Sequence, residues 1–348
     1  MKVSFVSSQA ISKALRYQTS RIQSDLTRAM TEATTWRVAD TGLALGARSS
    51  ISVALNREID RLKGITDSNE LASARLKSTQ AGLQDLTKAA DTLLGSYQTA
   101  FSGAGEPSVA RQQAEQTLTL MSSILNTNQM GENIFAGINT DVTPFNDFLD
   151  PASPNRVAFD TAFSAHFGFP ATDAAAVNIT AAQMEAFLTS VEPQFTGAGW
   201  QGTWSAADDQ QITTRITLTE TAQTSVSANI PAFRKLAMAA AIVTVGFGGP
   251  LNEAARRVVL EKGIELLGGA TADLANQQAH TGITQQRLAQ ASERMSTQIN
   301  LFSNSIHDLE GVDEIEAAAR VTSLKTQLEV SYSLTASMQK LSLLNYLS

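Results

Sequence analysis

The chain has 348 residues, no cysteine and a formal net charge of −7, with 26 Lys and Arg against 33 Asp and Glu. The lack of cysteine excludes disulfides, thiolate metal sites and cysteine nucleophiles. The acidic balance and the absence of any Lys/Arg-rich run argue against nucleic-acid binding, because neutralising phosphates needs a basic surface. Aromatic residues make up only 6% of the chain. This composition favours long helices with small residues at their seams over a compact enzyme core.

An amphipathic helix is predicted from residue 10 to about residue 38. Apolar residues recur there every three or four positions and mark one helix face: Ile11, Leu15, Ile22, Leu26, Ala29, Ala33 and Trp36. Two glycines, Gly42 and Gly46, predict an extended or turning break after it. Polar residues interrupt any apolar stretch near the start, so we expect no cleaved secretion signal. The most apolar run, 236–247, is too short to span a membrane, which needs about 20 residues.

A second long helix is predicted from about residue 50 to residue 101. Gly64 and Gly82 lie inside its pattern, and each costs about 1 kcal/mol relative to alanine. Residues 102–106 predict a loop, after which Pro107 suits the first position of a third helix that ends near residue 128.

The helical periodicity disappears between about residues 141 and 230, where prolines and aromatic residues are common. Strict alternation over 212–219 predicts a half-buried strand, and a helix is expected around 181–188. We interpret this segment as a mixed, mostly β insertion. Trp200 and Trp204 could line a carbohydrate site, but anchoring of turns inside the insertion is the favoured interpretation.

Helices return after Pro231, with another over about 252–267. A four-three apolar and polar repeat over 274–309 then predicts a coiled-coil seam. Gly311 is expected to end it, and Asp313 with Glu316 predicts a capping-box-like start of the last helix. That helix carries an apolar stripe to the end of the chain: Val321, Leu324, Leu328, Met338, Leu341, Leu344 and Leu347.

Both terminal stripes need a surface against which to be buried, either the other terminus or the same segments of neighbouring molecules. The chain is therefore predicted to be an assembly protein. The predicted assembly interface consists of Ile11, Leu15, Ile22, Leu26, Ala29, Val321, Leu324, Leu328, Met338, Leu341, Leu344 and Leu347.

The expected fold is mainly α, an antiparallel helical rod made from both chain ends with the central insertion. Its predicted parts are an N-terminal assembly helix (1–45), two rod segments (46–140 and 231–310), the insertion (141–230) and a C-terminal assembly helix (311–348).

No catalytic, cofactor or metal site is predicted. The three histidines, His166, His280 and His307, are scattered without metal-ligand spacing, and no P-loop, GxSxG or dinucleotide-binding fingerprint occurs. Acidic residues cluster near His307 and could bind a divalent cation, but the favoured interpretation is electrostatic stabilisation of a helix N-terminus. These acids are Asp308, Glu310, Asp313, Glu314 and Glu316.

Three stretches carry a resemblance to a known family. They are the opening segment 1–62, the glycine-bounded turn G-E-N-I-F-A-G over 131–137 with its Gly131, Phe135 and Gly137, and the ending L-S-L-L-N-Y-L over 341–347. Together they resemble the flagellin superfamily, and within it the hook-associated proteins that join hook to filament (the hook-associated protein 3 class). The resemblance covers both helical arms.

The resemblance implies an extracellular structural subunit of the bacterial flagellum, exported through the type III apparatus without a cleaved signal peptide. Its implied partners are itself, in a ring, the neighbouring hook-associated protein and flagellin, and a cytoplasmic export chaperone on the C-terminal helix. Neither nucleic acid nor membrane is expected as a partner. A filament flagellin and a secreted coiled-coil adhesin or effector remain the alternatives.

Overall fold

The structure, a computed structural model, describes the backbone of residues 8–347 and the side chains of residues 10–337. Five helices account for most of the chain: α1 (Ser8–Thr35), α3 (Ser49–Phe101), α8 (Pro231–Gly246), α9 (Glu253–Glu310) and α10 (Glu314–Leu347). The described part divides into two compact units, which are considered separately. Unit 1 combines 1–64 with 295–348, and unit 2 consists of 65–294.

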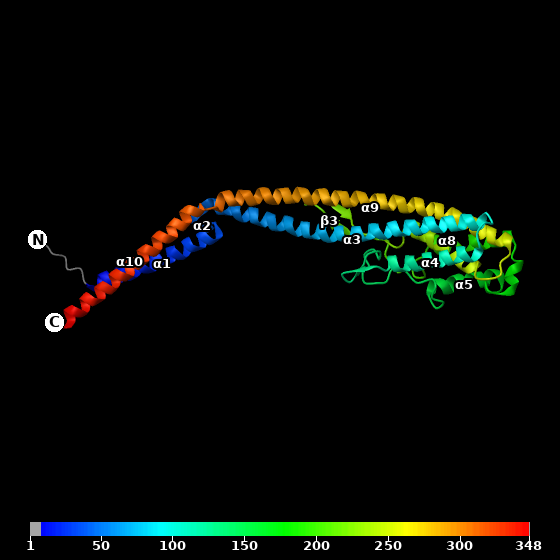
Figure 1. Cartoon of the computed structure of the whole chain (residues 1–348), viewed down its shortest axis with the longest axis horizontal. Helices are drawn as coiled ribbons and strands as arrows, with labels where there is room; N and C mark the ends of the chain where they lie inside the picture. The colour runs from blue at the N-terminus through cyan, green and yellow to red at the C-terminus, as the bar shows by residue number, and fades with distance from the viewer. Residues whose placement is uncertain (1–7, 348) are drawn as a thin grey trace. The chain divides into compact units, whose positions relative to one another are not determined.

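Unit 1 is built on the pairing of α1 with α10, which lie side by side in Figure 1. Their direction is antiparallel, because Thr19 contacts Ser331 whereas Glu32 contacts Arg320. α1 ends at Thr35, and Trp36 takes the left-handed backbone conformation, with φ of 55°, that turns the chain. α1 and α10 thus form one antiparallel helix pair, as the sequence predicts for a rod made from both terminal regions.

Unit 2 contains the antiparallel pair formed by the later part of α3 and the earlier part of α9. The Gln278 side chain of α9 donates to the Leu83 carbonyl oxygen (3.2 Å), and the Asn69 side chain of α3 donates to the Ser292 hydroxyl (3.3 Å). These two side-chain amides therefore donate across the seam, which limits the cost of burying their N–H groups.

The main core of unit 2 lies where α4 (Pro107–Leu125) and α8 pack on this pair. α8 is buried along almost its whole length. Its alanine-rich sequence lets neighbouring backbones approach closely. The Tyr97 hydroxyl of α3 donates to the Ala239 carbonyl oxygen at 2.9 Å, which satisfies the one polar group of this buried ring.

The segment between α4 and α8 contains less sheet than the sequence predicts. Its sheets are two hairpins, β1 (Asn128–Gln129) with β2 (Glu132–Asn133) and β3 (Thr213–Arg215) with β4 (Thr221–Gln223). Helices dominate instead: α5 (Pro154–Phe167), the 3-10 helix η2 (Ala174–Asn178), α6 (Ala181–Val191) and α7 (Pro193–Thr196). The helix predicted around 181–188 is confirmed, whereas the strand predicted over 212–219 forms only over Thr213–Arg215, after which the chain turns into β4. The extent of sheet was overestimated because large aromatic side chains, not strand pairing, fill this part of the core.

Trp200 and Trp204 are fully buried and stacked on one another, with ring centroids 5.6 Å apart. Phe195 lies 4.6 Å from Trp204 in the same cluster. They anchor the turns of this segment, so the alternative of an exposed carbohydrate platform is excluded.

The predicted break between the first two long helices is present, but most of its residues are helical. Residues 41–48 form a short helix α2 (Thr41–Leu45) and a 3-10 turn η1 (Gly46–Arg48), where an extended or turning segment was expected. α9 runs through Gly268 and Gly269 without interruption. Tertiary packing overrides the helix propensity of glycine here, whose cost is only about 1 kcal/mol per residue. In α3, a Cβ at Gly82 would lie 2.8 Å from the Ile124 side chain, so this glycine permits close packing against α4.

Candidate assembly interface

The two predicted terminal stripes face each other within one chain. In α1, Ala29 and Ile22 are buried, whereas Ile11, Leu15 and Leu26 are half-buried. In α10, Val321, Leu324 and Leu328 are half-buried. The side chains of Met338, Leu341, Leu344 and Leu347 lie outside the described residues. The stripes thus cover one another partially, and their role between molecules stays a prediction.

Polar contacts fix the register of the antiparallel pair formed by α1 and α10. The hydroxyls of Thr19 and Ser331 are 2.8 Å apart, and the Gln23 side chain donates to the Tyr332 hydroxyl at 2.6 Å. Nearer the turn, Arg320 pairs with Glu32 at 3.1 Å. A one-residue slip would break these contacts, so they specify the pairing that the apolar stripes alone leave open.

α10 carries a second stripe, on the side away from α1, that sequence reasoning missed. We call it the outer face of α10; it consists of Ile315, Ala319, Thr322, Thr326, Val330 and Ser333, all of them exposed. None of them is charged. The hydroxyls of Thr322 and Thr326 donate to carbonyl oxygens one turn earlier in their own helix. The signal in the sequence is a three-four repeat of small and β-branched residues without charges.

The turn between α9 and α10 is locked to the end of α1 by a buried carboxylate. Glu310 is only 5% exposed, accepts a hydrogen bond from the Ser52 hydroxyl and lies 3.5 Å from the Arg37 guanidinium. The backbone adds two bonds, from the Val38 amide to the Glu310 carbonyl (2.8 Å) and from the Val312 amide to the Trp36 carbonyl (3.1 Å). We call this arrangement the Glu310 latch.

α10 begins where predicted. The Asp313 carboxylate accepts from the amides of Ile315 (2.8 Å) and Glu316 (3.1 Å), which satisfies two of the free N–H groups of the first turn. Glu316 also pairs with Arg320 at 3.0 Å. Several acids near His307 therefore have structural partners. In the described part of the chain, no group of three metal-ligating side chains lies together, and no helix there is long and apolar enough to cross a membrane.

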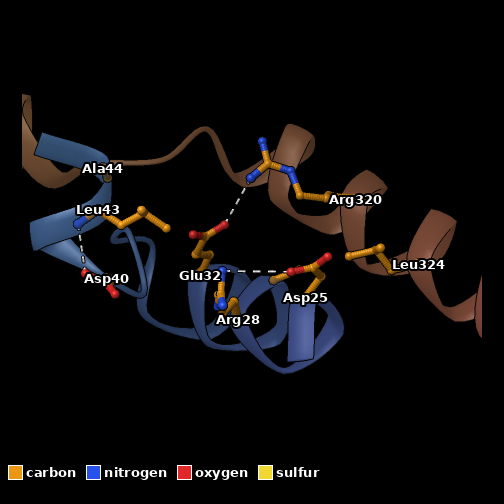
Figure 2. A pocket seen from close by; sticks show the side chains of 9 residues that line it. Asp25, Arg28, Glu32, Asp40, Leu43, Ala44, Arg320 and Leu324 are labelled. Carbon is orange, nitrogen blue, oxygen red and sulfur yellow. Dashed lines mark hydrogen bonds and ion pairs between the residues drawn. The ribbon is translucent and has the colours of Figure 1, made fainter. Parts of the chain in front are cut away.

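A hollow of about 360 Å³ opens between α1, α2 and α10 (Figure 2). We call it the α1–α10 socket. It combines three carboxylates, two guanidiniums and a small apolar floor, lined by Asp25, Glu32, Asp40, Arg28, Arg320, Ala29, Leu43, Ala44 and Leu324. Glu32 faces Arg320 across the hollow, and Leu43 is 74% exposed beside it. An exposed leucine at the mouth of an acidic hollow suits a contact with another protein surface.

The glycine-bounded turn of the family resemblance lies in unit 2. Gly131 and Gly137 both have left-handed backbone conformations, with φ of 89° and 68°, and Phe135 between them is fully buried. Phe135 packs edge-on against Phe233 with ring centroids 5.9 Å apart, and the Ala228 amide donates to its carbonyl oxygen. The turn thereby fixes the segment after α4 to the start of α8.

The structure thus defines a helical protein in which the first helix, α1, pairs antiparallel with the last, α10. Comparison with known proteins agrees. Residues 6–140 match the bacterial flagellin N-terminal helical region, and residues 264–347 match the bacterial flagellin C-terminal helical region. The two matches cover more than half of the chain, which belongs to the flagellin family.

A solved structure from Vibrio parahaemolyticus, described as a flagellar hook-associated protein, has a similar fold. The TM-score is 0.54 at 11% sequence identity, over 76% of this chain and 97% of that chain. No curated protein matches the chain. Family membership makes the chain an extracellular structural subunit of the bacterial flagellum that assembles with other flagellar subunits.

Proposed function

We propose that this chain is the subunit that joins hook to filament, as a ring of identical copies exported without a cleaved signal peptide through the type III apparatus. The hook-associated description of the Vibrio parahaemolyticus structure, together with the shared fold, supports a hook-associated role. So does the ending L-S-L-L-N-Y-L over 341–347, which resembles junction proteins more than filament subunits.

The observation that carries the proposal is the uncharged outer face of α10. In unit 1, α1 and α10 are paired, yet α10 still exposes apolar side chains on the side away from α1, including Ile315 (81% exposed) and Val330 (52% exposed). The threonine hydroxyls on this face donate to carbonyl oxygens of their own helix. Burying such a face stabilises an assembly by about 25 cal/mol per Å² of apolar area without desolvating charges. In free chains this exposed face would bind other proteins nonspecifically. A cytoplasmic export chaperone bound to the C-terminal helix would prevent such contacts before assembly.

Deleting the gene tests this function. For a junction subunit, the cells make hooks without filaments and release flagellin into the medium, and the full-length gene restores filaments. For a filament flagellin, filaments disappear but no unpolymerised flagellin accumulates. For an adhesin or effector, filaments and swimming are unchanged. Either of the last two results overturns the proposal.

A further inference from the structure

We propose that the α1–α10 socket binds the N-terminal half of α1 of a second copy of this chain, so that neighbouring copies are staggered along their terminal helices. This inference rests on the proposed function, because it names the contact between copies within the assembly. The segment that binds is the basic stripe of α1, consisting of Lys13, Tyr17 and Arg21.

The socket has a net negative charge. Its two guanidiniums are already paired, Arg320 with Glu32 at 3.1 Å and Arg28 with Asp25 at 3.8 Å. The Asp40 carboxylate accepts only the Leu43 amide, at 2.9 Å, as the N-cap of α2. One carboxylate thus lacks a cationic partner beside an exposed leucine. The complement to such a site is a cation next to a large, partly apolar side chain.

The basic stripe of α1 has this chemistry. Lys13, Tyr17 and Arg21 are spaced four residues apart and share one helix face. Tyr17 is 75% exposed, and Arg21 touches Asp25 only at the limit of an ion pair, 4.0 Å. Within α1, no acid precedes Asp25. α1 is therefore basic in its first half and carries the acids of the socket in its second half.

Lys13 and Tyr17 cannot reach the socket of their own chain, and Arg21 touches only its edge, at Asp25. Tyr17 lies 12 residues before Ala29 of the socket on the same helix, and 12 residues advance a helix by about 18 Å. A parallel copy shifted by about this distance along α1 brings Tyr17 over Leu43, with Lys13 and Arg21 on either side near the carboxylates. The contact is heterologous, which is the kind that forms rings and helical arrays.

A cysteine pair tests the contact in intact flagella. The natural chain has no cysteine, so Tyr17→Cys with Leu43→Cys introduces the only thiols. Both positions are exposed, so the fold should be unaffected. A disulfide needs Cα atoms within about 7 Å, which excludes a bond within one chain. Mild oxidation should therefore give covalent dimers and larger ladders of this chain that disappear on reduction. The matched control joins Tyr17→Cys with Val53→Cys, an exposed position of unit 1 outside the socket.

A charge variant supplies the second readout. In the Tyr17→Cys, Leu43→Cys chain, reversing the stripe with Lys13→Glu and Arg21→Glu should lower the cross-linked fraction several-fold. Lys13→Arg with Arg21→Lys should leave it unchanged.

If the chain is present in the isolated flagella but cross-links no better than the control, or only to a different protein, the inference is wrong and the proposed function stands. If the chain is absent from flagella whose filaments assemble normally, both are wrong.

Discussion

At the scale of single residues, Gly137 combines a left-handed backbone conformation with the close approach of another backbone segment. Its φ is 68°, and a Cβ there would lie 2.3 Å from the Asp208 carbonyl oxygen. We expect Gly137→Ala to lower the free energy of unfolding by well over the 1 kcal/mol that left-handed strain alone costs, because backbone must move. Gly131→Ala is the control, since its φ is 89° but its Cβ would meet open space. Equal losses in the two variants, measured by denaturant unfolding, would contradict this account.

Tyr97 is the residue whose titration should affect stability. Burial raises its pKa well above 10.0, because the charged phenolate cannot be solvated in the core. The protonated ring therefore contributes stability that is fully present below about pH 10 and is lost as the pH rises from there through the raised pKa of the folded state. Tyr97→Phe should abolish this alkaline loss while costing about 1 kcal/mol at neutral pH for the bond to Ala239. Urea titrations at pH 8 and pH 11 would detect the difference; identical slopes against pH in both proteins would refute it.

Helix starts and ends could be predicted from single residues where the residue type has one dominant structural role. The break at Gly311, the start of α4 at Pro107 and the cap at Asp313 could all be predicted from the sequence. The Glu310 latch could not. A glutamate among five acids gives no sign that its carboxylate is buried against Ser52, which lies 258 residues away in the chain.

At the scale of elements, the β3–β4 hairpin is held on α3 and α9 mainly by Ile216. Its side chain is fully buried in a small cluster with Leu76 and Leu288, and the Asn69 amide donates to its carbonyl oxygen at 3.0 Å. Ile216→Ala should cost roughly 2–5 kcal/mol of unfolding free energy. Ile283→Ala, at a 56% exposed position of α9, should change it by less than about 0.5 kcal/mol. Similar values from denaturant unfolding would show that the hairpin is not anchored in this way.

The Glu310 latch should control how firmly the α9–α10 turn is held to the end of α1. Glu310→Ala removes the acceptor of the Ser52 hydroxyl and leaves the Arg37 guanidinium without its partner. We expect hydrogen exchange at the amides of Val38 and Val312 to accelerate, because their bonds join the two segments. Asp308→Ala, a change at an exposed acid of the same helix, is the control. Unchanged exchange in Glu310→Ala would mean that the backbone bonds suffice.

The long helices could be predicted from periodicity because their apolar spacing persists over many turns. Their interruptions were harder to predict. Gly268 and Gly269 lie between the helix predicted over 252–267 and the seam predicted over 274–309, yet α9 is continuous through them because packing outweighs their small cost. In the middle segment, the alternation over 212–219 indicates a strand that forms only over Thr213–Arg215. It does not reveal that aromatic packing, not further strands, completes the core.

At the scale of the whole molecule, both terminal helices and their pairing follow from the two apolar stripes. The outer face of α10 could not be predicted in this way, because threonine and serine are polar residue types. Only the structure shows that the hydroxyls of Thr322 and Thr326 are bonded to the backbone of their own helix. A search for apolar periodicity detects only the more apolar of two stripes on one helix. The partners of each stripe between molecules likewise depend on shape, which one sequence does not contain.

A charge on the outer face of α10 should block assembly without unfolding the chain. Val330→Glu places a carboxylate on an exposed position, so the free energy of unfolding should change by less than about 0.5 kcal/mol. Within an assembly the same carboxylate would be desolvated without a partner, which is costly. We expect the chain to move from isolated flagella into the medium, as measured by immunoblotting. Gln327→Glu makes the same charge change at an exposed position off this face and should assemble normally; equal loss in both variants would contradict the account.

The central claim is that this chain forms the joint between hook and filament, and its location in the flagellum tests that claim most directly. Immunogold electron microscopy with an antibody against residues 141–230 should label each flagellum once, where the hook ends and the filament begins. Label along the filament, or no label on flagella that carry normal filaments, would contradict it.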